Sequence, residues 1–266
     1  SAKRAGADCV KFQFFSTTNL FSSKNYQLNP KLKDTVSKYA MSENNLAKMK
    51  IYAEKLNIDF AVTPFSKQGA DFLVEKLNVD FIKVASMDLN NLDFLEYISK
   101  KKKPIVLSTG LSNSSEIKEA VKTIKKAGNK RIVLLHCISS YPPRDNEINL
   151  NNIDSLSKTY PYPVGFSDHT IGTSISLAAI AKGACIIEKH FTTNKNLQGR
   201  DNKFSLKPKD LKKICDLRNI FSEFKIDRGL NIQKNEKDIL TLKKKIYDSL
   251  DNTMKFIFRT YDKLEV

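Results

Sequence analysis

Two short apolar runs, each ending in polar residues that include a histidine, most strongly constrain the fold of this chain. They are residues 164–170 (VGFSDHT) and residues 186–191 (IIEKHF). The intervening residues 172–183 carry apolar side chains at helical spacing and predict a packed helix. A strand, a helix and a strand in so short a stretch require parallel neighbours joined by a right-handed crossover. The pattern therefore predicts an α/β fold.

His169 and His190 each lie near the end of one of these runs. We therefore expect both at the carboxyl ends of adjacent strands, where α/β folds hold their functional residues. Two neutral imidazoles side by side can bind a divalent metal ion. The chain has only three histidines, and this placement of two of them favours a metal site. The alternative is that one is a hydrogen-bonded core residue and the other a loop residue.

The same unit, a short apolar strand followed by a helix, recurs along the chain. Seven strands are expected, around residues 11, 61, 83, 106, 134, 166 and 188. Residues 1–8 resemble the end of a preceding helix, so the pattern favours a (β/α)8 TIM-type barrel that lacks its first β-strand. A complete barrel needs about 250 residues, and the chain has 266. A doubly wound open sheet is the alternative, but neither GxGxxG nor GxxxxGK[ST] occurs.

Helices are expected where the apolar period is about 3.6 residues. The segments are 42–56, 66–77, 92–101, 114–127, 150–158, 172–183 and 206–224. Leu46, Met49, Ala53 and Leu56 form the predicted apolar stripe of the first of these. Residues 16–41 are polar and lack a clean period, so they are expected to form a long active-site loop.

The net charge of +16 raises the question of nucleic-acid binding. Only seven of the 45 basic residues are arginines, and the lysines are spread over nearly every predicted helix. This distribution is typical of solvated helix faces, so no nucleic-acid partner is expected, although a positive field favours anionic small substrates. No apolar run approaches membrane-spanning length. The four scattered cysteines indicate a cytoplasmic, reducing setting.

Polar residues close every predicted strand and would meet at one mouth of a barrel. They are Lys11, Gln13, Thr63, Lys83, Ser86, Ser108, Thr109, Ser139, Ser167, Asp168, His169, Lys189 and His190. Lysines and hydroxyls supply the donors that a phosphate or carboxylate requires, and the histidines can ligate a cation. The set favours an anionic substrate held beside a Lewis-acid metal. For any single serine or threonine, ordinary strand-end capping is the alternative.

Six of these stretches together resemble the sialic acid synthase family, which includes N-acetylneuraminate synthase and its legionaminic and pseudaminic acid relatives. They are VKFQ (10–13), TPF (63–65), STG (108–110), LLHC (134–137), GFSDHT (165–170) and IIEKHF (186–191). The resemblance implies a transferase that condenses phosphoenolpyruvate with N-acetylmannosamine or a related diacetamido sugar. The product would be a nine-carbon 2-keto acid, released with phosphate.

The resemblance also implies roles for individual residues. His169 and His190 would hold a divalent metal, Mn²⁺ or Mg²⁺. Phosphoenolpyruvate would be bound by Lys11, Thr63, Lys83, Ser86, Ser108 and Ser167, and the sugar by Gln13, Tyr141 and Asp201. Ser139 and Lys189 are expected to add contacts to substrate from the strand ends. Asp88 would place the water that attacks C2 of phosphoenolpyruvate, and Lys11 and Asp201 are expected to act with it in catalysis.

The chain departs from the family pattern at three places. Residues 199–202 (GRDN) replace GPDH, and residues 86–88 (SMD) replace Ser-Gly-Glu. Ser139 stands where some members have asparagine. The first departure bears on the choice of sugar, because it removes a histidine next to Asp201.

The expected organisation is a synthase barrel over residues 1–228 and a linker and tail over residues 229–266, without the antifreeze-like domain of the family. The full-length form is expected to be a homodimer. Two other functions stay open. One is a truncated, catalytically impaired barrel that only binds phosphoenolpyruvate or metal. The other is a different phosphate-using barrel enzyme, such as an aldolase with Lys83 or Lys189 as its Schiff-base lysine.

Overall fold

A computed structural model describes residues 1–199, 201–224, 226–227 and 229–240. The chain divides into two compact units, Ser1–Phe221 and Ser222–Val266. In the second unit the structure describes a 3-10 helix at Lys234–Ile239. The predicted tail beyond residue 240 lies outside the described residues. Among the described helices, none combines the length and the apolar character needed to cross a bilayer.

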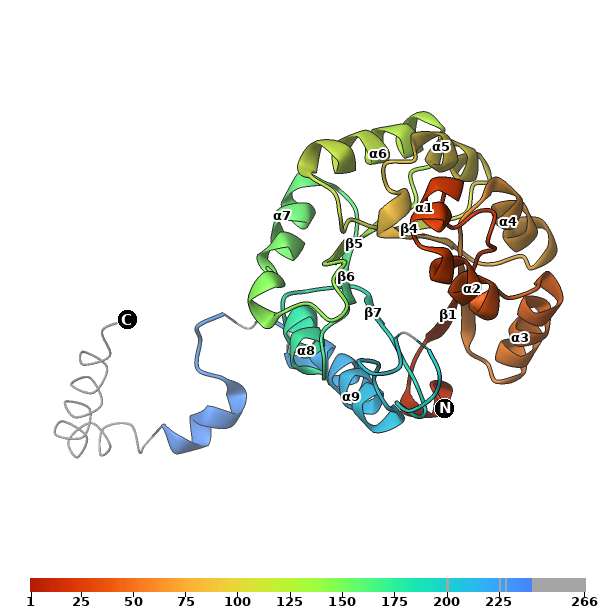
Figure 1. Cartoon of the computed structure of the whole chain (residues 1–266). Coiled ribbons are helices and arrows are strands. Elements are labelled where there is room, and N and C mark those ends of the chain that lie inside the picture. Colours follow the sequence, from red (N-terminus) through yellow and green to blue (C-terminus); the bar gives the residue numbers. More distant parts are fainter. Residues whose placement is uncertain (200, 225, 228, 241–266) are drawn as a thin grey trace. The chain divides into compact units, whose positions relative to one another are not determined.

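Parallel strands form the interior of the first unit (Figure 1). They are β1 (Cys9–Phe14), β2 (Asp59–Pro64), β3 (Ile82–Val84), β4 (Ile105–Ser108), β5 (Ile132–Cys137), β6 (Val164–Asp168) and β7 (Ile187–Lys189). β1 pairs with β2, β3 to β7 pair in chain order as a second sheet, and β2 lies next to β3. Within the described residues β1 pairs only with β2 and β7 only with β6, so β1 and β7 each keep one unpaired edge. The predicted α/β fold with parallel strands is confirmed.

Helices surround the strands on the outside (Figure 1). They are α3 (Glu43–Lys55), α4 (Lys67–Asp71), α5 (Leu92–Lys100), α6 (Ser114–Lys126), α7 (Asn151–Thr159), α8 (Ser174–Ala181) and α9 (Pro208–Phe224), and α4 continues as a π-helix at Phe72–Lys76. The starts of several are set by side-chain caps: Ser42 accepts a bond from the Asn45 amide and Asn113 from the Glu116 amide. The predicted stripe on α3 is only half correct, because Leu46 and Ala53 are buried whereas Met49 and Leu56 are exposed.

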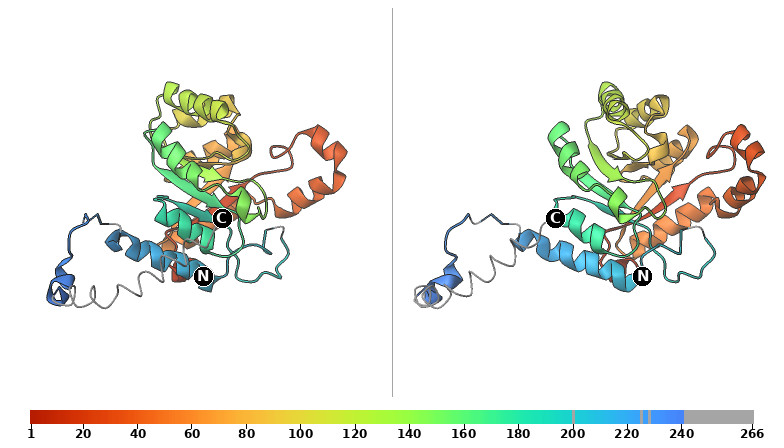
Figure 2. Two further views of the ribbon diagram at one scale, coloured as in Figure 1. Left: turned by 90° about the vertical axis from the view of Figure 1, so that its left-hand side faces the viewer. Right: turned by 60° about the vertical axis from the view of Figure 1, so that its left-hand side comes forward.

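The prediction that residues 16–41 form a loop is wrong, because this segment contains α1 (Ser23–Leu28) and α2 (Pro30–Tyr39). Ser22 caps α1 and Pro30 begins α2, both ordinary helix-start signals. α2 buries only Val36, so the sequence shows no apolar stripe that would reveal it. The two helices project from the first unit on the same side as the segment between β7 and α9 (Figure 2).

Successive side chains of each strand point to opposite faces of the sheet. One set packs against the helices and forms the hydrophobic core, and the other set points into the ring of strands. Leu107, Leu134 and Phe166 of β4, β5 and β6 are fully or almost fully buried against the helices, with Ile98 of α5 and Ile124 of α6. The residues that alternate with them face the strand interior. This second set includes charged and hydroxyl side chains, which places polar chemistry inside a ring whose outer face is apolar.

The third histidine, His136, belongs to the outward-facing set of β5. Its Nε2 lies 2.7 Å from the Ile148 carbonyl oxygen, and its ring packs on Phe166 with centroids 5.5 Å apart. Burial lowers the pKa of His136, although the Ile148 carbonyl opposes the shift. His136 is therefore a core residue and takes no part in the site described below.

We predict that neutral His136 makes folding stability depend on pH. The lowered folded pKa means that only the unfolded state takes up this proton near the ordinary value of 6.5. The stability contribution is fully present above that value and is lost as the pH falls below it. Urea unfolding at about pH 7.5 and about pH 5 should show a larger loss for the wild type than for His136→Gln. Equal losses would contradict the prediction.

Candidate active site

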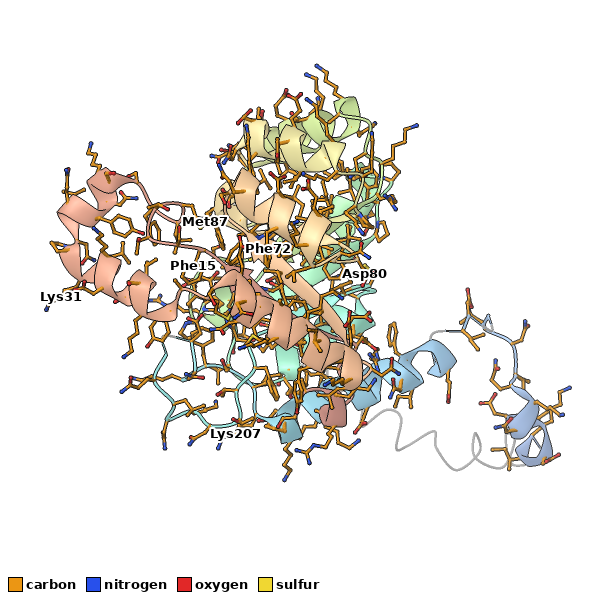
Figure 3. All side chains as sticks on the ribbon, turned by 90° about the vertical axis from the view of Figure 1, so that its right-hand side faces the viewer. Phe15, Lys31, Phe72, Asp80, Met87 and Lys207 are labelled. Atoms are coloured by element: carbon orange, nitrogen blue, oxygen red, sulfur yellow. The ribbon has the colours of Figure 1, made fainter. Side chains whose placement is uncertain are left out.

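The segments that follow the strands gather on one side of the first unit. Figure 3 shows Phe15, just after β1, and Met87, shortly after β3, toward the side on which Lys31 of α2 projects. Asp80, shortly before β3, lies on the opposite side (Figure 3). The carboxyl ends of the strands therefore face α1 and α2, as expected for a parallel sheet with functional loops at one end.

Two lysines and a glutamate meet inside the ring of strands. Lys83 is 3% exposed, and its Nζ donates a hydrogen bond to Ser108 Oγ at 2.7 Å. Glu188 Oε2 lies 3.8 Å from Lys83 Nζ and 4.0 Å from Lys11 Nζ. Ser167 Oγ donates to the other Glu188 oxygen at 2.9 Å. Side chains from β1, β3, β4, β6 and β7 thus form one charged cluster.

The charges in this cluster are set by mutual attraction. Burial alone would raise the pKa of Glu188, but Lys11 and Lys83 outweigh it and hold that pKa at about 2. Burial lowers the pKa of Lys83, and Glu188 opposes the shift. Glu188 is therefore ionised at neutral pH and compensates only part of the lysine charge, which leaves a site that attracts anions. The sequence reading missed Glu188, although its place beside Ser167 in the parallel register could have revealed it.

Two hydroxyl groups converge next to this cluster. Ser86 Oγ lies 3.6 Å and Ser139 Oγ 3.8 Å from the buried Cys137 Sγ. A Cβ atom at Gly110 would overlap Ser139 Oγ and would lie 2.8 Å from Ser86 Oγ. Only glycine leaves this space open, so the two loops can present their hydroxyls to one small group. Hydroxyl donors beside a buried ammonium suit a phosphate or a carboxylate. We call Lys83, Ser86, Ser108, Gly110 and Ser139 the anion cradle.

His169 and His190 lie together, with ring centroids 5.4 Å apart. His169 Nδ1 lies 2.9 Å from the Ile138 carbonyl oxygen and must donate to it, because a carbonyl only accepts. Nε2 is then the nitrogen left for a ligand. His190 Nδ1 lies 3.5 Å from Asp201 Oδ2, which likewise leaves its Nε2.

The protonation of the two imidazoles differs. Burial lowers the pKa of His190 to about 4, although Asp201 acts in the opposite direction, so His190 is neutral at pH 7. Burial also acts to lower the pKa of His169, but Cys137 and the Ile138 carbonyl raise it overall. A metal ion would therefore compete with a proton at His169, which makes binding pH-dependent.

The pair fits a divalent cation that takes its other ligands from substrate or water. Among the described residues, no group of three or more His, Cys, Asp or Glu side chains is arranged to hold a metal ion. Two imidazoles, each with its Nδ1 beside an oxygen of Ile138 or Asp201, nevertheless supply nitrogen ligands of fixed orientation.

Aromatic rings enclose the two histidines. Tyr141 packs on His169 with centroids 4.2 Å apart, and Phe204 packs edge-on against His190 at 5.2 Å. Tyr141 and Phe204 also contact each other at 6.0 Å. Phe204 is buried and was not identified from the sequence. These contacts limit the rotation of both imidazoles.

Three further predicted residues lie at the ends of β1, β2 and β3. Gln13 and Thr63 are partners in the β1–β2 register, where Gln13 is exposed and Thr63 is buried. Asp88 ends the 3-10 turn Ser86–Asp88. Its Oδ2 is buried and has no hydrogen-bond partner among the described residues. Burial raises the pKa of Asp88, against a hydrogen bond from Asn91. A carboxylate of this kind can act as a base.

Lys189 does not join the cluster, contrary to the expectation that it contacts substrate. Its side chain is 5% exposed, and its Nζ lies 2.8 Å from Asp168 Oδ2. Ser176 of α8 donates to the same carboxylate oxygen. Strand alternation explains the placement, because Lys189 follows the inward-facing Glu188 and so faces the helices. We therefore leave Lys189 out of the site.

We predict that Gly110→Ala blocks the anion cradle without unfolding the protein. The added methyl group occupies the space between the Ser86 and Ser139 hydroxyls, so affinity for inorganic phosphate should fall at least about tenfold, the effect of losing one charge-assisted hydrogen bond or more. Isothermal titration calorimetry measures the affinity. Ser115→Ala, at an exposed position of α6, is the control and should bind as the wild type does. Unchanged binding by Gly110→Ala would refute the assignment of the cradle.

Comparison with known proteins places these residues in context. Residues 1–225 match the model of the NeuB family. The chain is 44% identical over 225 residues to N,N'-diacetyllegionaminic acid synthase of Campylobacter jejuni, covering 80% of this chain and 67% of that protein. It is 36% identical over 228 residues to the enzyme of the same name from Legionella pneumophila, covering 80% of this chain and 64% of that protein.

A solved structure is also similar. It is N-acetylneuraminic acid synthetase from Leptospira borgpetersenii in complex with citrate, with a TM-score of 0.82 and 32% identity. The match covers 91% of this chain and 83% of that one. The chain spans about two thirds or less of the length of the curated relatives it matches.

Proposed function

Because the chain belongs to the NeuB family, we propose that it joins phosphoenolpyruvate to the open aldehyde form of an N-acetylated hexose. The product is a nine-carbon 2-keto acid of the sialic acid type, and inorganic phosphate is released. One observation carries the proposal: an anion cradle and two oriented imidazoles lie at the same end of the strands. The cradle suits an enol phosphate, and the imidazoles suit a cation that activates a carbonyl group.

The anion cradle would bind the phosphate and carboxylate of phosphoenolpyruvate. Lys83 and Lys11 supply the positive charge, and Ser86, Ser108 and Ser139 supply hydroxyl donors. Glu188 keeps both lysines ordered without neutralising them. The positive charge that Glu188 leaves uncompensated would therefore attract an anionic substrate. Thr63 of β2 and Ser167 of β6 would add further contacts to that substrate.

The sugar would bind nearer the mouth. A divalent cation, manganese or magnesium, bound at His169 and His190 would polarise the aldehyde oxygen. Asp201 orients His190 and is itself partly exposed, so it can also accept a hydrogen bond from a sugar hydroxyl. Gln13 is exposed at the end of β1, and Tyr141 lies against His169, so both are placed to contact the sugar.

The reaction then needs one carbon–carbon bond and one water. C3 of phosphoenolpyruvate bonds to the aldehyde carbon as the C=O π bond breaks, and the former aldehyde oxygen takes up a proton to become a hydroxyl group. C2 of phosphoenolpyruvate becomes electron-deficient. Asp88 would take a proton from the water that adds to C2, since its Oδ2 is free of partners among the described residues. The tetrahedral C2 then loses the proton of its new hydroxyl group to the departing phosphate, which leaves with the bridging oxygen, and C2 becomes the ketone of the product.

We predict that phosphate release from phosphoenolpyruvate requires a divalent ion, the sugar and both histidines. Release should be assayed with Mn²⁺ and either N-acetylmannosamine or 2,4-diacetamido hexoses, and the sugar that supports release identifies the acceptor. His169→Ala and His190→Ala should each lose at least about 100-fold in rate, the scale of losing a main electrostatic contribution. Release that is unaffected by either change would contradict the proposal.

Asp88 gives a separate prediction. Asp88→Asn should lower kcat about 10²- to 10⁴-fold, the usual contribution of a general base, and should leave phosphoenolpyruvate binding intact. Asp88→Glu, which keeps the carboxylate, should retain most of the activity. Since burial raises the pKa of Asp88 above the ordinary 3.8, activity should fall as the pH drops through this raised value. Equal activity of the Asn variant would exclude Asp88 as the base.

An aldolase that uses a Schiff base is the second candidate. Burial lowers the pKa of Lys83, a property that favours a nucleophilic amine. Trapping with borohydride in the presence of a keto acid separates the two functions, because the condensation forms no imine. Lys189 no longer qualifies, since Asp168 and Thr170 hold its ammonium group.

Two structural points are proposed from the family resemblance alone. An eighth strand would fit between the free edges of β7 and β1, and a longer form of the protein would be a homodimer. Light scattering of a form that includes the eighth strand and the antifreeze-like domain of the family tests the second point.

A further inference from the structure

An ion pair lies directly behind the two histidines, on the helix side of the strands. Lys189 Nζ lies 2.8 Å from Asp168 Oδ2, and the two side chains are 5% and 0% exposed. The two residues are partners in the β6–β7 register. Each immediately precedes one histidine of the pair, His169 or His190.

Every hydrogen-bonding position of this ion pair is used. The Asp168 carboxylate accepts bonds from the Thr170 amide at 2.8 Å and the Thr170 hydroxyl at 2.7 Å, and also from Ser176 Oγ and Lys189 Nζ. Lys189 Nζ also donates to the Thr170 carbonyl oxygen at 2.6 Å and contacts its hydroxyl at 3.3 Å. A buried ion pair contributes to stability only when its remaining polar groups are satisfied, and this one meets that condition.

The position of the pair matters more than its strength. The backbone pairing of β6 and β7 ends at Asp168 and Lys189. His169 and His190 are the first residues beyond that pairing, so no further backbone bond of this ladder holds them at their separation of 5.4 Å. The ion pair links the two strands at the point where the ladder stops, and Thr170 extends the link one residue past His169.

We propose that the Asp168–Lys189 ion pair sets the distance and orientation of His169 and His190, so that their Nε2 atoms bind one cation. Both residues are positioning residues, because they touch the histidines only through the backbone. The inference rests on the proposed function, since it assigns the histidine pair to a metal ion. This role also explains why Lys189, although it lies at a strand end, faces the helices and not the anion cradle.

The test measures Co²⁺ binding to the protein without substrate. Calorimetry gives the affinity, and the visible absorption of the bound ion reports its ligands. The double variant Asp168→Asn with Lys189→Met removes both charges together, which is often near-neutral for stability. It should fold, as judged by thermal unfolding, and should bind Co²⁺ about 10- to 100-fold more weakly, the usual effect of losing an outer-shell partner. The single variant Lys189→Arg keeps the charge and should retain most of the wild-type affinity for Co²⁺.

Two controls separate positioning from general stability. Lys101→Met removes a lysine that pairs with Asp71 and Glu75 between outer helices, and it should leave Co²⁺ affinity unchanged. His169→Ala should abolish the absorption band and so locate the ion. If the double variant does not fold, Ser176→Ala replaces it. This change removes one bond to Asp168 from α8 and should weaken Co²⁺ binding to a smaller extent.

The outcomes are distinct. The inference is overturned if the folded double variant binds Co²⁺ with wild-type affinity. Where Ser176→Ala replaces the double variant, wild-type affinity in Ser176→Ala overturns it. A wild-type protein that binds no Co²⁺ also overturns it. Equal weakening by Lys101→Met would also overturn it, because the effect would then be one of stability. A wild-type protein that binds Co²⁺ through the histidines but releases no phosphate from phosphoenolpyruvate refutes the proposed function and leaves this inference intact.

Discussion

The parallel register of β6 and β7 is the constraint on which the rest of the site depends. It pairs Ser167 with Glu188 and Asp168 with Lys189. Because side chains alternate along a strand, the first pair faces the interior and the second faces the helices. The next residues, His169 and His190, then open toward the mouth. A shift of β7 by one residue against β6 would turn Glu188 toward the helices and Lys189 toward the interior, and would move His190 away from His169. This register must therefore be strongly specified.

Electrostatics then divides the interior into two parts. Lys83 is almost fully buried, and its ammonium group is held by Ser108 and Glu188. Because Glu188 offsets only part of the lysine charge, the cluster stays positively charged. Burial lowers the pKa of His190 and keeps it neutral, whereas Cys137 and the Ile138 carbonyl raise the pKa of His169. An anion and a carbonyl group can therefore lie side by side, each beside the groups that stabilise it.

Much of the fold could be predicted from the sequence, because buried parallel strands are continuous apolar runs with a polar residue at the end. The strands, most helices and the meeting of Lys11, Lys83 and the histidines follow from that pattern. α1 and α2 could not be predicted, since α2 buries a single residue and shows no period. Lys189 was wrongly expected to face the mouth and Glu188 was not identified, because strand-end position alone does not say to which side of the sheet a side chain points. Phe204 contacts His190 although the two lie 14 positions apart in the sequence, and no local signal marks such a contact.

The central claim is that water adds to C2 of phosphoenolpyruvate after the carbon–carbon bond forms. The most direct test uses phosphoenolpyruvate labelled with ¹⁸O at the bridging oxygen, with mass analysis of both products. The account predicts that the label leaves with phosphate, because the bond between C2 and the bridging oxygen breaks. Label retained in the keto acid would mean that the phosphorus–oxygen bond breaks instead. That result would contradict the account.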